Sequence, residues 1–123
     1  MKKIVLLITC LAVAGGVFAQ AQKGIETLKI KTSIEPCPIC KKRVEDYFKR
    51  EPGITYLNVN THTKLVTVKY YTDRNTAPNL RTAIANLGYD ADTVTANADS
   101  YARLPPCCKK GGMAAMKKQR SQH

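Results

Sequence analysis

The chain of 123 residues lacks most of the features that would predict conventional enzyme chemistry or a membrane-embedded structure. It shows no general acid–base pair and no activated hydroxyl nucleophile, so we do not expect an enzyme of either type. Beyond residues 1–19, no apolar run is long enough to span a bilayer, which excludes stable membrane insertion of the mature chain. There is also no detectable internal repeat, and the length has room for one domain.

The first 19 residues have the pattern of a secretory signal peptide. Two lysines precede an apolar stretch over residues 4–17, and Ala19 ends a cleavage site with small residues. We therefore expect residues 1–19 to be removed during export across the inner membrane and the mature protein to be periplasmic. Cys10 lies inside the apolar stretch and is lost with it, because the residues before it make a poor lipidation signal.

Positive charge outweighs negative charge throughout the chain. Twenty Lys and Arg face nine Asp and Glu, a formal charge of +11 that becomes +9 without the two N-terminal lysines. A basic surface can bind nucleic acid, acidic membranes or an acidic protein, or can simply keep a monomer soluble. Export argues against nucleic acid as the partner.

Apolar periodicity predicts four strands and two helices in one domain over residues 27–96. Strands are expected at residues 27–34, 54–60, 65–71 and, with the weakest alternation, 89–96. Helices are expected at residues 38–50, with Tyr47 and Phe48 in the core, and from a Thr76 cap to a left-handed Gly88. This order predicts an α+β, ferredoxin-like βαββαβ sandwich, in which two helices cover one face of a four-stranded antiparallel sheet.

The segments on either side of this domain have no comparable pattern. Residues 20–26 form a short polar lead-in, and residues 97–123 form a basic tail that contains cysteine and methionine. We expect the tail to be largely disordered, with Met113 and Met116 as ordinary tail residues. We interpret His62 as a solvated turn histidine at the opposite end of the sheet from Cys37.

Cys37 and Cys40 enclose a Cys-Pro-Ile-Cys motif at the start of the first predicted helix. A helix N-terminus favours negative charge, and Lys41, Lys42 and Arg43 add positive charge, so thiolates form readily there. The two thiols can share a soft metal ion or bond to each other. A disulfide over so short a loop contributes little stability, which favours chemistry over scaffolding.

Cys107 and Cys108 form a second pair in the tail. Their thiols are soft ligands, so they could build a second metal or redox site. Alternatively, they could fold back and complete a four-thiolate site with Cys37 and Cys40. Adjacent cysteines are awkward ligands for one ion, and their other option is a strained vicinal disulfide.

The cysteine motif and the order of elements together resemble the heavy-metal-associated domain family over about residues 27–96. Pro-Gly-Ile at residues 52–54 and Leu-Gly-Tyr at residues 87–89 add to the resemblance. The family includes small copper chaperones, periplasmic mercuric-ion-binding proteins and N-terminal modules of metal-transporting ATPases. The resemblance implies that Cys37 and Cys40 are metal ligands and that Tyr89 lies near the metal loop, where it shields the ion.

Glu35 departs from the family pattern, which usually has a methionine packed beneath the loop at this position. A carboxylate beside two thiolates favours a harder or higher-coordinate ion than copper(I), unless it points into solvent. The departure therefore leaves the identity of the ion open.

The sequence thus predicts an exported carrier that holds one soft ion between Cys37 and Cys40. Two ligands on an exposed loop leave coordination positions open, so a partner thiolate can bind before an original ligand leaves. Copper(I) is favoured, with mercury(II), zinc and cadmium as alternatives. The expected partner is a metal-transporting membrane protein or another carrier whose acidic surface meets Lys41, Lys42 and Arg43.

The alternative function is that of a periplasmic thiol–disulfide oxidoreductase that uses the same cysteine motif. A thioredoxin-like fold would need further elements after the last strand and a cis-proline facing the motif. Residues 53–77 contain no proline, and Pro78 opens a predicted helix.

Overall fold

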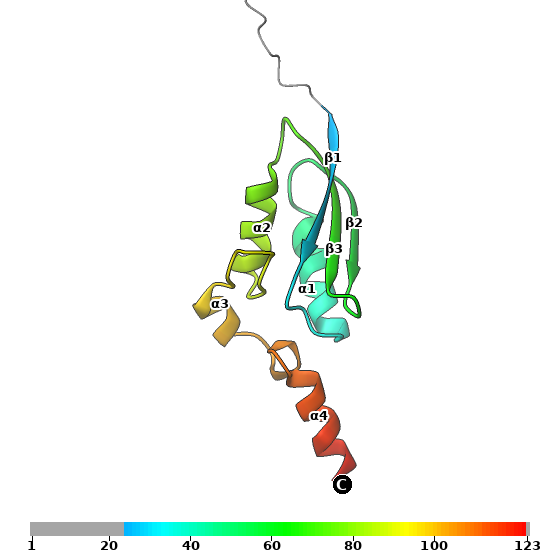
Figure 1. The fold of residues 1–123 in the computed structure, drawn as a ribbon, viewed down its shortest axis with the longest axis vertical. Helices are drawn as coiled ribbons and strands as arrows, with labels where there is room; N and C mark the ends of the chain where they lie inside the picture. The colour runs from blue at the N-terminus through cyan, green and yellow to red at the C-terminus, as the bar shows by residue number, and fades with distance from the viewer. Residues whose placement is uncertain (1–23, 123) are drawn as a thin grey trace, which may run out of the picture.

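A computed structural model describes residues 24–122. The predicted signal peptide lies outside these described residues. The elements follow the order β1 (Ile25–Lys31), α1 (Pro38–Phe48), β2 (Ile54–Asn60), β3 (Leu65–Tyr71), α2 (Ala77–Asn86), α3 (Ala98–Ala102), the 3-10 helix η1 (Pro106–Cys108) and α4 (Gly112–Ser121) (Figure 1). Within the described part of the chain, no helix combines the length and the apolar character needed to cross a bilayer.

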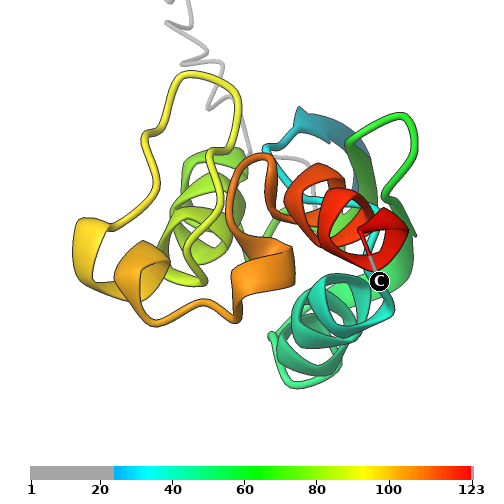
Figure 2. The same cartoon turned by 90° about the horizontal axis from the view of Figure 1, so that it is seen from below.

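The centre of the sheet is β3, which pairs antiparallel with β1 on one side and with β2 on the other. Ile30, Val66 and Val59 lie side by side across the three strands, and all three are buried. Alternate residues of a strand point to the same face, so this row marks the inner face of the sheet. Helices α1 and α2 cover that face (Figures 1 and 2) and bury Val44, Phe48, Leu80 and Ile84 against it.

The helix boundaries follow the local signals in the sequence. Pro38 occupies the first turn of α1 directly after Cys37, the N-cap residue. Thr76 caps α2, and its hydroxyl accepts a hydrogen bond from the backbone N–H of Asn79 at 3.3 Å. Gly88 follows α2 with φ +104°, the left-handed conformation that the sequence predicts there.

The predicted fourth strand over residues 89–96 is not formed. Ala91 makes only isolated bridges, one to Thr32 just beyond β1 and one to Val94. Ala91 and Val94 exchange backbone hydrogen bonds at 2.9 Å, and Asp92 between them has φ 52°. The chain therefore turns back on itself at the free edge of β1, where the fourth strand of a ferredoxin-like sheet would lie. The structure is an α+β, ferredoxin-like fold with a three-stranded sheet in its described residues.

The tail also differs from its prediction, because residues 98–121 contain α3, η1 and α4 rather than disordered chain. Leu104 is buried in the core, as are both tail cysteines. Helix α4 projects from the end of the domain at which α1 begins (Figure 1). A few long-range contacts hold this segment. Such contacts do not require a periodic pattern of apolar residues, so the sequence did not indicate them.

The exposed fractions of Tyr47 and Phe48 show which face of α1 packs against the core. The sequence places both in the core, but Tyr47 is 37% exposed whereas Phe48 is 1% exposed. The buried face of α1 instead consists of Cys40, Val44 and Phe48. We expect Phe48→Ala to lower the free energy of unfolding by about 3–5 kcal/mol, because it leaves a cavity.

The matched variant Tyr47→Ala should cost less than about 1 kcal/mol, as is usual for surface substitutions. Urea denaturation of both variants measures the difference. Equal losses would contradict the orientation of α1.

Candidate metal centre

Cys37 and Cys40 lie at the start of α1, one as the N-cap residue and the other in the first turn. Their side chains are 4% and 0% exposed. The prediction that this pair sits on a solvent-facing loop is therefore wrong for the described structure. The sequence analysis treated the tail as disordered, whereas η1 and α4 fold over the loop.

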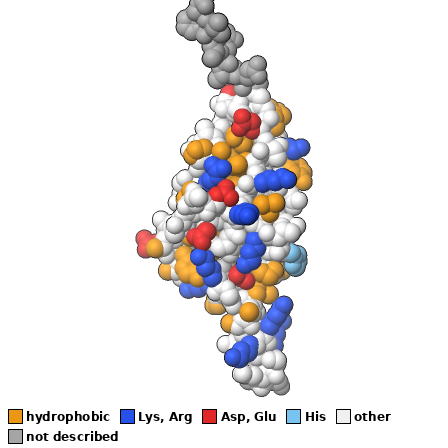
Figure 3. Space-filling model, viewed as in Figure 1, with side chains coloured by type: hydrophobic (Ala, Val, Ile, Leu, Met, Phe, Trp, Pro, Cys, Tyr) orange, Lys and Arg blue, Asp and Glu red, His pale blue; other side chains and the backbone are white. Residues whose placement is uncertain are grey.

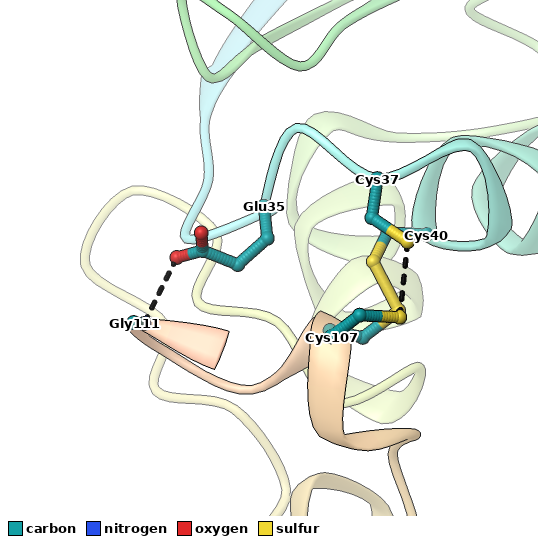
Figure 4. The surroundings of a disulfide bond; sticks show 6 residues. Glu35, Cys37, Cys40, Cys107 and Gly111 are labelled. Atoms are coloured by element: carbon teal, nitrogen blue, oxygen red, sulfur yellow. Dashed lines mark hydrogen bonds between the residues drawn. A yellow bond between two sulfur atoms is a disulfide. The ribbon is translucent and has the colours of Figure 1, made fainter. Parts of the chain in front are cut away.

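The tail brings Cys107 and Cys108 to the motif cysteines. All four are buried, and their Sγ atoms lie within 4.8 Å of one another (Figure 4). The structure thus places the second pair beside the first, one of the two arrangements that the sequence left open. The Sγ atoms of Cys107 and Cys108 are 3.9 Å apart, so these neighbours present their sulfurs side by side without a vicinal disulfide.

One disulfide crosses between the two cysteine pairs. It joins Cys40 to Cys108, 68 residues away in sequence, and leaves Cys37 and Cys107 as free thiols. A disulfide within either cysteine pair would contribute little stability, and on that basis the cysteines are not expected to scaffold the fold. That inference fails for a cross-pair bond, because closing a long loop removes much of the entropy of the unfolded chain.

The two free thiols share one hydrogen bond, with 3.0 Å between the Sγ atoms of Cys37 and Cys107. Burial raises the pKa of Cys37. Hydrogen bonds from the Cys107 thiol and from the backbone N–H groups of Cys40 and Ile39 outweigh burial and hold the pKa of Cys37 below its ordinary value. The same hydrogen bond and burial raise the pKa of Cys107. In the described structure the Cys37 thiol donates to Sγ of Cys107. Cys37 is therefore the first thiolate to form, and the Cys107 thiol then donates to it.

Glu35 does not point into solvent. Its carboxylate is buried and accepts hydrogen bonds from the backbone N–H of Gly111 at 3.2 Å and from Nζ of Lys64 at 3.4 Å. In Figure 4 the carboxylate reaches toward Gly111 and away from the sulfur atoms. The residue that departs from the family pattern thus connects the cysteine loop to the tail.

Tyr89 is fully buried, including its hydroxyl. Burial raises its pKa to about 12; the positive charge of Arg43 opposes this rise, and the charge of Cys37 adds to it. Tyr89 therefore lies within electrostatic reach of the thiols. Within residues 24–122, neither the Tyr89 hydroxyl nor Nε of Arg43 has a hydrogen-bond partner.

The basic run after the motif is largely paired within its own helix. Lys41 forms an exposed ion pair with Glu45 at 3.8 Å, and Lys42 pairs with Asp46. Arg43 is half-buried. These pairs reduce the net charge that α1 presents, and a role of the run in binding a partner stays a prediction.

His62 lies at the same end of the sheet as Cys37, contrary to the prediction. Strands β1 and β2 both run antiparallel to β3, so they are parallel to each other and end at the same edge. His62 and Cys37 therefore line one cleft of about 430 Å³, together with Pro36, Pro38, Lys41 and residues 58–61. The histidine side chain is exposed, and it is not one of the four clustered ligands.

A smaller pocket of about 220 Å³ lies between the cysteine loop and α4. Cys37 lines it from the cysteine loop, Cys107 lines it from η1, and Met113 and Met116 line it from α4. Thiols and thioethers are both soft ligands, so the pocket offers a soft ion a route to the free thiols. The sequence analysis had assigned both methionines to a disordered tail.

The cross-pair disulfide makes a testable contribution to stability. We expect Cys108→Ala to lower the free energy of unfolding by about 4 kcal/mol in the absence of reductant, an entropic estimate for a loop of this length. The difference between the variant and the unmodified chain should shrink markedly in excess reductant. A difference of the same size with and without reductant would show that packing, and not the bond, is responsible.

The hydrogen bond between the thiols of Cys37 and Cys107 leads to a second prediction. Because the pKa of Cys37 is lowered, its thiolate should form at a lower pH than that of an ordinary cysteine and persist above that pH. Cys107→Ala removes the hydrogen bond, so the thiolate should appear at a higher pH. Ultraviolet thiolate absorbance of the disulfide form, with Cys37→Ser as the blank, measures both titrations. An unchanged titration in Cys107→Ala would contradict the shared hydrogen bond.

Two copper-exporting P-type ATPases show similarity to part of this chain. The ATPase of Staphylococcus epidermidis is 29% identical over 74 residues, which cover 60% of this chain and 9% of the ATPase. That of Staphylococcus haemolyticus is 33% identical over 67 residues, 54% of this chain and 8% of the ATPase. The chain thus spans less than a tenth of the length of these relatives.

Solved structures share the fold. Oxidized MerP from Ralstonia metallidurans CH34 has a TM-score of 0.52 at 19% identity, covering 56% of this chain and 96% of MerP. The CopZ metallochaperone has a TM-score of 0.51 at 26% identity, covering 54% of this chain and 98% of CopZ. The water-soluble region of the P-type ATPase CopA from Bacillus subtilis has a TM-score of 0.52 at 30% identity, covering 57% of this chain and 46% of that region.

Residues 36–90 also match the heavy-metal-associated domain, and this match ends before the tail cysteines. It includes Cys37, Cys40 and Tyr89, and it omits Glu35 and the tail that Glu35 contacts. The similarity to the heavy-metal-associated domain is therefore confined to residues 36–90.

Proposed function

We propose that the protein is an exported carrier that binds one soft metal ion through Cys37 and Cys40 and transfers it to another protein. The observation that carries this proposal is the buried sulfur cluster at the start of α1. Its first two members lie in a heavy-metal-associated domain. Thiolates select soft ions, and the helix N-terminus stabilises their negative charge.

Copper(I) is the first candidate for the ion, followed by mercury(II), zinc and cadmium. Support for copper comes from the names of similar proteins, which include copper-exporting ATPases and a metallochaperone. Transfer would proceed by thiolate exchange, in which a thiolate of the partner binds the ion before Cys37 or Cys40 leaves it. The proposed partner is a metal-transporting membrane protein or another carrier with an acidic surface.

Loading requires the thiol form of Cys40. Reduction of the Cys40–Cys108 bond takes two electrons and two protons from a dithiol, which is itself oxidised to a disulfide. The proposed location is the periplasm, a compartment in which disulfides form and persist. A reducing partner is therefore part of the proposal.

Thiol–disulfide exchange is the second candidate function, because the Cys37 thiol with its lowered pKa lies in the same cluster as the Cys40–Cys108 disulfide. Against it, residues 24–122 contain no cis peptide bond, so no cis-proline faces the motif. The related domains are of the metal-binding type.

The carrier is tested by anaerobic titration of the reduced full chain with copper(I), followed by native mass spectrometry. We expect one ion per chain. Cys37→Ser/Cys40→Ser should abolish stoichiometric uptake, whereas His62→Ala, a change in the cleft beside Cys37, should retain it.

A loaded chain should also pass its ion to a domain with a Cys-x-x-Cys motif faster than the ion dissociates into a chelator. Uptake that survives Cys37→Ser/Cys40→Ser would refute the carrier. No uptake, combined with rapid reduction of a test disulfide, would establish the oxidoreductase instead.

A further inference from the structure

The tail is held against the cysteine loop by contacts that do not involve sulfur. Glu35 accepts the backbone N–H of Gly111, and Nζ of Lys110 pairs with the carboxylate of Asp90 at 2.7 Å. The backbone N–H of Lys110 donates to the hydroxyl of Tyr101 at 3.2 Å. Because Leu104 is also buried in the core, the docked position of the tail does not depend on the disulfide alone.

Two glycines allow the tail to turn sharply after the second cysteine pair. Gly111 has φ +74°, a conformation that other residues rarely adopt. A Cβ at Gly112 would lie 1.9 Å from the carbonyl oxygen of Pro106, a backbone atom that cannot move aside cheaply. The start of α4 can therefore pack against η1 only if residue 112 is glycine. This packing fixes the position of the helical turn that carries Cys107 and Cys108.

The four sulfurs have separations suited to one central ion. Sulfurs at about 2.3 Å from a tetrahedrally bound ion lie about 3.8 Å from one another. The Sγ atoms of Cys107 and Cys108 are 3.9 Å apart, those of Cys37 and Cys107 are 3.0 Å apart, and no pair exceeds 4.8 Å. After reduction, the Sγ atoms of Cys40 and Cys108, and those of Cys37 and Cys107, have to move apart to reach the tetrahedral separation.

We propose that the reduced protein binds a thiophilic divalent ion of the zinc, cadmium and mercury class in a closed four-thiolate centre formed by Cys37, Cys40, Cys107 and Cys108. This inference rests on the proposed function and deepens it, because it assigns the tail as the source of two ligands. For the closed form it also replaces copper(I), the first candidate for the open pair, with a divalent ion. A closed site with four thiolates suits tetrahedral divalent ions, whereas an open two-thiolate site suits copper(I).

Loading of the ion conserves electrons, protons and charge. A dithiol first reduces the Cys40–Cys108 bond and becomes a disulfide itself, which leaves four thiols on the chain. The divalent ion then displaces four protons into solvent and forms four metal–sulfur bonds, so the centre carries a net charge of −2. Lys41 borders the cleft beside Cys37, and Lys117 and Arg120 line the pocket beside Cys107. These cations oppose the added negative charge. Figure 3 shows Lys and Arg side chains on the end of the molecule from which α4 projects.

The docked tail sets how the ion leaves. While η1 stays in place, all coordination positions are occupied and a partner thiolate has no open position to attack. When the tail undocks, Cys107 and Cys108 withdraw and the ion remains on Cys37 and Cys40, the open form that exchanges ligands. A partner that binds the tail would therefore promote transfer.

The test uses the reduced full chain and two ions, zinc(II) for X-ray absorption and cobalt(II) for visible absorption. The unmodified chain should bind one zinc with four sulfur neighbours. Its cobalt form should show the intense bands of a tetrahedral four-thiolate site. Cys107→Ser/Cys108→Ser should still bind one ion but with two sulfur neighbours, and at least about a hundredfold more weakly, since losing even an outer partner of a ligand costs 10–100-fold.

Gly112→Ala tests the docked geometry with all four cysteines intact, and it should weaken zinc binding at least about tenfold. Gln119→Ala, an exposed change on the same helix, should leave affinity and spectrum unaltered. Two sulfur neighbours in the unmodified chain, or an unchanged sulfur count in Cys107→Ser/Cys108→Ser, overturns this inference and leaves the carrier intact. Retained copper(I) uptake by Cys37→Ser/Cys40→Ser overturns the carrier itself, so the two failures are distinguishable.

Discussion

The cysteine cluster depends on one interaction: the tail docks across the start of α1 and brings its two sulfurs against the two sulfurs of the motif. Glu35 and Gly111 connect the loop to the tail, and the close approach at Gly112 fixes the turn that follows. Burial of Cys37 and Cys40, the shared proton between Cys37 and Cys107 and the cross-pair disulfide all result from this docking.

Docking also changes the chemistry expected of a heavy-metal-associated domain. An open pair of thiolates favours exchange because a third ligand can approach, whereas a buried set of four favours retention. In this chain the choice between the two lies with the tail, which the family match does not include. The disulfide adds a redox condition, because Cys40 and Cys108 can serve as ligands only after they are reduced. In the proposed carrier, binding, retention and release of the ion would all depend on the contact between the tail and the cysteine loop.

Sequence reasoning worked where structure is local. Strand alternation, the Thr76 cap and the Gly88 terminus lie within a few residues of the elements that they define. Strands β1, β2 and β3 and helices α1 and α2 were therefore predicted, whereas α4 was not. The fourth strand failed because its alternation was weak and Asp92 turns the chain back. The predicted position of His62 was wrong because of the strand topology. Strands β1 and β2 are both antiparallel to β3, so they end at the same edge of the sheet.

The candidate site was predicted in part. Cys37 and Cys40 could be identified from their spacing, but the pairing of Cys40 with Cys108 could not, because four cysteines allow three connectivities and spacing favours none of the long-range ones. Two signals for the docked tail were nevertheless present. Glu35 replaces the usual methionine beneath the loop, and two glycines follow shortly after the tail cysteines. Neither signal can be interpreted from the sequence alone. The hydrogen bond to Glu35 and the close approach at Gly112 each involve a second segment of the chain, and the position of that segment has to be known first.

The most direct measurement is disulfide mapping of the unreduced protein after acid quenching and tryptic digestion. Residues 32–41 contain both motif cysteines, and residues 104–109 contain both tail cysteines, so each pair falls within one tryptic peptide. The account predicts that these two peptides are joined and that fragmentation assigns the bond to Cys40 and Cys108. Separate peptides, each with an internal disulfide, would contradict the docked tail.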